Sequence, residues 1–94
     1  MLSEIQKMQF TPRAKSEAAN LLKDLRIISL NEDTLCDLQE ELDLRVASLV
    51  TSKECEGEKI DEELLEIYDL LTDIVLDNEE NLDFLNSLFF NSKD

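Results

Sequence analysis

Apolar residues recur at steps of three and four along most of the chain, the spacing that places side chains on one face of an α-helix. Three stripes of this kind predict three helices, over residues 12–29, 32–50 and 62–90. Their members are Ala14, Ala18, Leu21, Leu25 and Ile28; then Leu35, Leu38, Leu42, Val46 and Leu49; then Leu64, Tyr68, Leu71, Val75, Leu82, Leu85 and Phe89.

Each predicted helix starts at a residue that can cap it. Thr11 precedes a proline, which suits the first helical position because the N–H that proline lacks would have no partner there. Asn31 and Asp61 are each followed by two acidic residues, which the positive end of the helix dipole favours. The polar stretch 51–60, which holds the only glycine, Gly57, is predicted to be the main loop.

Two features leave the helix boundaries open. The third stripe keeps its period through Asn78, which is either a buried polar position in one continuous helix or a cap at which the chain bends. The first two stripes can also be joined in phase into one long helix of a hairpin, which would dimerise to cover its apolar surface. Residues 1–11, where Leu2, Ile5 and Met8 share a face, form either an arm or a short extra helix.

Composition favours the same fold class. The 94 residues include one Gly, one Pro and few aromatic residues, and 43% are hydrophobic, which is typical of a helical domain rather than of a sheet protein or a disordered chain. We therefore predict an all-α fold, a small helical bundle of three to four helices, with the long dimerising hairpin as the alternative. Residues 1–94 are expected to form a single helical domain, since so short a chain has room for one core.

The chain lacks the residues that most catalytic mechanisms need. It has no His, no Gly-rich phosphate loop and no pairing of Cys with His, so we expect no enzyme activity and no cofactor. The acidic run from Asp77 to Asp83 offers oxygen ligands, but Leu82 stands where a calcium loop needs Gly, and no metal site is predicted. Cys36 and Cys55 are not spaced as a disulfide framework, and no apolar run is long enough for a membrane span, so a cytoplasmic location is expected.

Charge is distributed unevenly along the chain. Residues 31–94 hold 20 Asp or Glu against four Lys or Arg, whereas the first 30 residues have a net charge of +2, and the whole chain carries −14 at pH 7. A negative charge of this size favours a partner with a positively charged surface, and it argues against direct binding of nucleic acid. We expect a partner protein with a basic surface.

Two groups of residues in the last third of the chain are predicted to bind this partner. Acidic residues opposite the third apolar stripe recur every three or four positions and form a row on one helix face. The C-terminal tail adds more Phe and Leu than one helix seam can bury, and aromatic anchors among polar residues are typical of an interaction surface. The alternatives are that the acidic row is only a solvated face, and that the tail folds back onto the core. The predicted partner-binding residues are Glu66, Asp69, Asp73, Asp77, Glu80, Asp83, Phe84, Leu88 and Phe90.

These observations favour a non-catalytic protein–protein interaction module, such as an adaptor, a regulator or an inhibitor. Its expected partner is another protein with a basic and partly apolar surface, and not a membrane; a homodimer is compatible with the pattern. A first alternative is an acidic mimic of nucleic acid that inhibits a DNA- or RNA-binding protein, because successive carboxylates on a helix are spaced similarly to backbone phosphates. A second alternative is a structural subunit of a homo-oligomer, assembled through the apolar seam from Leu64 to Phe89.

Overall fold

The computed structural model describes residues 2–55 and 61–90 of the chain. This part folds into helices without a strand, which confirms the predicted all-α class. The radius of gyration is 13.4 Å, typical of a compact domain of this length. The helices are α1 (Glu4–Gln9), α2 (Pro12–Asp24), α3 (Glu32–Cys55), α4 (Glu62–Asp77) and α5 (Leu82–Phe90).

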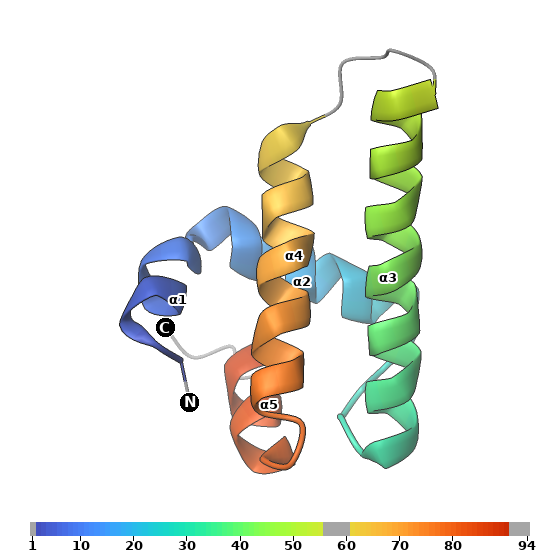
Figure 1. The fold of residues 1–94 in the computed structure, drawn as a ribbon. Coiled ribbons are helices and arrows are strands. Elements are labelled where there is room, and N and C mark those ends of the chain that lie inside the picture. The colour runs from blue at the N-terminus through green and yellow to red at the C-terminus, as the bar shows by residue number, and fades with distance from the viewer. Residues whose placement is uncertain (1, 56–60, 91–94) are drawn as a thin grey trace.

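The antiparallel pair of α3 and α4 forms the largest helix contact of the molecule. In Figure 1, α2 crosses behind both of these helices, and the short α1 lies on the side of α4 that faces away from α3. Helix α5 follows the lower end of α4 and packs against α2. Helix α4 therefore lies at the centre and contacts α1, α2 and α3.

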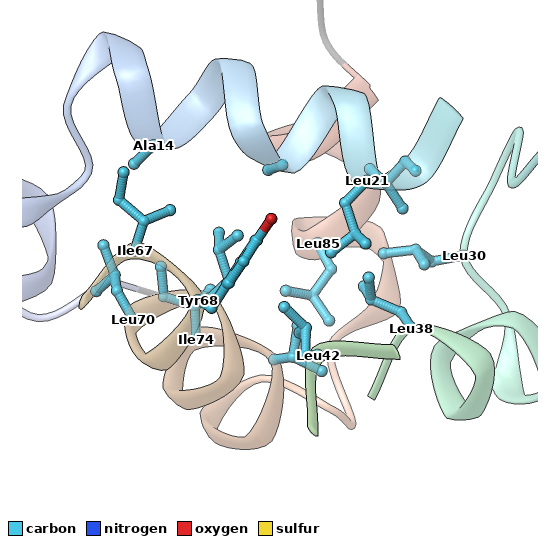
Figure 2. Packing of buried hydrophobic residues seen from close by; sticks show 14 of the residues in the cluster. Ala14, Leu21, Leu30, Leu38, Leu42, Ile67, Tyr68, Leu70, Ile74 and Leu85 are labelled. Carbon is cyan, nitrogen blue, oxygen red and sulfur yellow. The ribbon is translucent and has the colours of Figure 1, made fainter. Parts of the chain in front are cut away.

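The core lies where α2, α3, α4 and α5 meet (Figure 2). Tyr68 lies in the middle of this cluster, with aliphatic side chains from the neighbouring helices around it. Much of the predicted third stripe is buried here, within one chain. The largest fully buried side chains are Leu21 of α2, Leu42 of α3, Leu71, Ile74 and Val75 of α4, and Leu85 of α5.

Helix α2 ends at Asp24, earlier than predicted, because the chain turns into the left-handed region at Arg26, where φ is 58°. The N–H of Ile27 donates to the carbonyl of Leu22 at 2.9 Å, and that of Arg26 donates to the carbonyl three residues before it at 3.0 Å. This is the Schellman pattern of a helix end. It buries Ile27, with 7% of its surface exposed, and leaves Ile28 89% exposed, so the prediction that Ile28 continues the apolar stripe of this helix was wrong.

Replacing Arg26 with Gly is expected to raise the free energy of unfolding. A residue with a Cβ is strained in the left-handed region, and we expect relief of about 0.5–1 kcal/mol from Arg26→Gly. Arg26→Ala is the matched control, since it removes the same exposed side chain and charge but keeps the strain. Urea denaturation measures both variants, and equal stabilities would contradict the assignment of strain to this position.

Helix α3 begins as predicted and ends later. Asn31 Oδ1 accepts the N–H of Thr34 at 2.9 Å, and Thr34 Oγ1 accepts the N–H of Asn31 at 2.8 Å, so the two residues cap the helix reciprocally. The turn before Asn31 separates α2 from α3, so the single long helix of the hairpin alternative is not formed. The predicted loop 51–60 was placed too early, because residues 51–55 continue the helix; Gly57 lies outside the described residues.

The predicted helix over 62–90 is broken. Asn78 ends α4 as its C-cap, with its backbone N–H bonded to α4 carbonyls and its side-chain Nδ2 donating to the carbonyl of Ile74 at 2.9 Å. A new helix starts after Asn81, whose Oδ1 accepts the N–H of Phe84 at 3.3 Å. The bend at Asn78 was among the alternatives, but this residue closes one helix instead of opening the next.

The first residues form the short helix α1 rather than an arm. Ser3 and Gln6 make a reciprocal capping box at its start. The predicted apolar face of α1 is mostly not buried: Leu2 packs partly against the core, while Ile5 is 68% exposed and Met8 81% exposed. None of the helices in residues 2–55 and 61–90 is long and apolar enough to cross a membrane.

Candidate protein-binding groove

Residues 6–13 run along α4 in the opposite direction and are fixed to it at both ends. At one end, Gln6 Nε2 donates to Asp77 Oδ2 at 3.0 Å, near the last turn of α4. At the other end, the guanidinium of Arg13 bonds to the carboxylates of Asp61 and Glu63, at the first turn of α4. The two attachments are about 21 Å apart along α4, at 1.5 Å per residue. We call residues 6–13 the strap.

Interactions between charged side chains hold the Arg13 end of the strap on α4. Hydrogen bonding to Arg13, and then to the backbone N–H of Leu64, lowers the pKa of Asp61, and the two carboxylates raise the pKa of Arg13. Asp61 also caps α4, since its Oδ1 accepts the N–H of Leu64 at 3.1 Å. Because the pKa of Asp61 is lower in the folded state than in the unfolded state, its ionised form stabilises the fold at neutral pH. This stabilisation is lost as acid protonates Asp61.

A groove of about 460 Å³ lies between the strap and α4. Ile67 and Leu70 form its base, and Figure 2 shows the two side chains together on the part of α4 beneath Ala14. Along α4, residues at steps of three and four share a face, so the acidic residues of the groove lie together on one side of its apolar base. Its lining residues are Gln9, Thr11, Glu63, Glu66, Ile67, Asp69, Leu70 and Asp73.

Three carboxylates of the groove, those of Glu66, Asp69 and Asp73, are exposed and have no ion pair within the described part of the chain. Several of the chain's cations are paired elsewhere. Arg13 is held at the end of the groove by Asp61 and Glu63. Other pairs are Lys7 with Glu4, Arg45 with Glu41 and Asp24, and Lys53 with Glu62.

The exposed apolar residues of α1 lie beside this groove. Gln9 lines the groove, and Ile5 precedes it by one helical turn on the same face of α1. Met8 follows Ile5 by three residues and is its neighbour on the helix surface. Helix α1 therefore contributes Gln9 to the groove and exposes two apolar side chains close to it in the chain.

The structure separates the predicted partner-binding residues into four sets. Glu66, Asp69 and Asp73 lie together in the groove, whereas Asp77 accepts the hydrogen bond from Gln6. Glu80 and Asp83 are exposed but follow the bend at residues 78–81, so they do not continue the row in a straight line. The residues of the tail, Phe84, Leu88 and Phe90, are half-buried and pack against the core.

Helix α5 folds back on the rest of the molecule, in agreement with the alternative considered for the tail. Phe89 packs edge-on against Phe10 of the strap, with ring centroids 6.5 Å apart. Asn86 binds both backbone groups of Leu30: Oδ1 accepts the N–H at 2.6 Å, and Nδ2 donates to the carbonyl at 3.0 Å. These contacts fix α5 beside the strap and beside the turn that precedes α3.

Sequence reasoning did not place Gln9 and Thr11 at the candidate site. The apolar pair Ile5 and Met8 carried a signal, because their spacing predicted a helix face, but the pattern did not indicate that α4 would lie beside it. Cys36 of α3 is exposed. Among the described residues, no group of three or more His, Cys, Asp or Glu side chains is arranged to hold a metal ion.

Comparison with protein families, with curated proteins and with solved structures finds no match to this chain.

Proposed function

We propose that this protein is a non-catalytic protein-interaction module, an adaptor, regulator or inhibitor, that binds a partner with a basic and partly apolar surface. The observation that carries the proposal is the set of three exposed carboxylates, Glu66, Asp69 and Asp73, that have no counter-charge in the described chain and line a groove. Cations on a partner would supply that counter-charge, and complementary charge also speeds and orients association.

Apolar contacts support the same proposal. Ile5 and Met8 belong to α1, the helix that ends at Gln9 of the groove, and they expose most of their surface, which a partner's apolar side chains could cover. The half-buried tail residues Phe84, Leu88 and Phe90 contribute through the area that they still expose, while their buried parts hold α5 in place. An interface with an apolar centre and a polar rim is the usual arrangement between proteins.

The exposed carboxylate row also supports a second candidate, a mimic of nucleic acid that occupies the basic groove of a DNA- or RNA-binding protein. The bend after Asp77 limits the straight part of the row to Glu66 through Asp77, which spans about 16 Å at 1.5 Å per residue. A mimic would rely on carboxylates over the whole surface, and its binding would fall steeply with salt. An interaction module would depend on the groove and on its apolar neighbours.

Neutralising the groove is expected to weaken capture of the partner from a cell extract about tenfold, since each of three ion pairs contributes roughly 0.3–0.5 kcal/mol. Two triple variants remove the same number of charges through the same residue types. The groove variant carries Glu66→Gln, Asp69→Asn and Asp73→Asn. The α3 variant carries Asp37→Asn, Glu40→Gln and Asp43→Asn, at exposed positions of the neighbouring helix. Circular dichroism checks that both variants keep their helix content.

The α3 variant is expected to capture the partner nearly as well as the unmodified protein. Equal losses in the two variants would indicate that total charge, and not the groove, determines binding, which favours the mimic. Unchanged capture by the groove variant would contradict the assignment of the partner to this surface.

A further inference from the structure

The two walls of the groove have different chemistry. The wall formed by α4 carries Glu66, Asp69 and Asp73 above the apolar base. The strap contributes no cation opposite these carboxylates, since residues 8–11 are Met, Gln, Phe and Thr. Gln6 and Arg13 bind the acidic residues at the two ends of the groove, whereas the strap provides no cation for the three carboxylates in the middle.

The other wall, formed by Gln9 and Thr11 of the strap, is polar and uncharged. Gln9 lines the groove, is exposed, and has an amide that can donate and accept hydrogen bonds. Ile5 lies one helical turn before Gln9 on α1, and Met8 follows Ile5 by three residues; both side chains are mostly exposed. A segment that lies in the groove and continues over the exposed side of α1 would therefore meet carboxylates on one side and apolar groups on the other.

We propose that the groove binds an extended segment of a partner protein in which Lys or Arg alternates with apolar residues. This inference rests on the proposed function and adds the conformation and sequence pattern of the bound segment. Successive side chains of an extended chain point to opposite sides, so alternation presents cations to α4 and apolar groups to α1. Alternate residues are about 6.6–6.8 Å apart, and the three carboxylates rise along α4 by about 4.5 and 6 Å, a mismatch that long Lys and Arg side chains span. The amide of Gln9 is placed to bond with the backbone of such a segment.

The probe is a fluorescein-labelled peptide, Lys-Leu-Lys-Leu-Lys-Leu-Lys, titrated with the full chain and followed by fluorescence anisotropy. Two control peptides separate the contributions to binding. One replaces each Leu with Ser and keeps the charge, and the other, Lys-Lys-Leu-Leu-Lys-Lys-Leu, keeps the composition but has helical periodicity. We expect saturable binding of the alternating peptide, and about tenfold weaker binding of both controls, because each loses a large part of the apolar contact.

Three protein variants locate the binding. The groove variant is expected to bind the alternating peptide about tenfold more weakly, and the α3 variant within about twofold of the unmodified protein. A double variant, Ile5→Ser with Met8→Ser, should bind the Leu and Ser peptides with equal affinity, because it removes the exposed apolar surface of α1. These two residues are mostly exposed, so the fold is expected to tolerate the change.

Equal affinity for the alternating and helical-period peptides would overturn the proposed extended conformation. Equal losses in the groove and α3 variants, or no saturable binding of the alternating peptide, would overturn the groove as its site. If peptide binding fails while the groove variant still loses its partner in the capture experiment, the proposed function stands and the proposed segment is wrong. If both experiments fail, the proposed function is wrong as well.

Discussion

Leu42→Ala is expected to lower the free energy of unfolding by about 3 kcal/mol, within the range measured for large-to-small changes in tightly packed cores. Leu42 is completely buried, on the face of α3 that packs into the core. A void of only about 10 Å³ lies beside it, so the packing is nearly complete before the change. Removing the isopropyl group loses burial energy and leaves a cavity, because side chains from α2 and α4 surround the site and collapse only in part.

Leu44→Ala is the matched control for this prediction. It makes the same chemical change two positions away on α3, but Leu44 is 65% exposed, and we expect a change within about 0.5 kcal/mol. Urea denaturation followed by circular dichroism measures both variants. Similar losses for the two variants would contradict the orientation of α3 in this fold.

Asn86→Ala is expected to lower the free energy of unfolding by about 2 kcal/mol, because it leaves the N–H and the carbonyl of buried Leu30 without their side-chain partner. Asn86 and Leu30 are 56 residues apart, and this pair of hydrogen bonds fastens α5 to the turn before α3. The loss should therefore reduce the protection of α5 amides in hydrogen exchange as well as the global stability.

Ser87→Ala is the control for Asn86→Ala, since Ser87 is exposed on the same helix and should tolerate the change. A loss below about 0.5 kcal/mol for Asn86→Ala, the range of ordinary surface changes, would mean that water replaces the amide without cost. Unchanged exchange in α5 would contradict its attachment through Asn86.

Helix starts were easier to predict from this sequence than helix ends. Thr11, Asn31 and Asp61 cap the helices that they were predicted to cap, because capping depends on a side chain and on backbone groups only three residues away. The end of α2 was missed because Arg26 occupies a left-handed position where glycine would have marked the turn.

The end of α3 was missed for a different reason. Residues 51–55 are mostly polar and were taken for a loop, yet Lys53 stays helical and pairs with Glu62 of α4 at 2.7 Å. A contact between two helices is not visible in the pattern of either one. Asn78 shows the same limit, since the choice between a continuous and a broken helix depends on how the following segment packs.

The candidate site was predicted in part. The spacing of Glu66, Asp69 and Asp73 on one helix face follows from helix geometry and could be seen in the sequence. The groove itself depends on contacts between residues 71 and 48 positions apart, those of Gln6 with Asp77 and of Arg13 with Asp61. Periodicity carries no information on such pairs, so the sequence could not predict the strap or the groove between the strap and α4.

Nuclear magnetic resonance can show whether the groove between the strap and α4 binds a basic, partly apolar partner. Spectra of the ¹⁵N-labelled protein would be recorded during titration with the alternating Lys and Leu peptide. We expect saturable shifts concentrated in residues 5–11 and 63–73, with little change in the acidic surface of α3 around Glu40. Shifts spread evenly over the acidic residues of α3 and α4, or an absence of saturable shifts, would contradict this expectation.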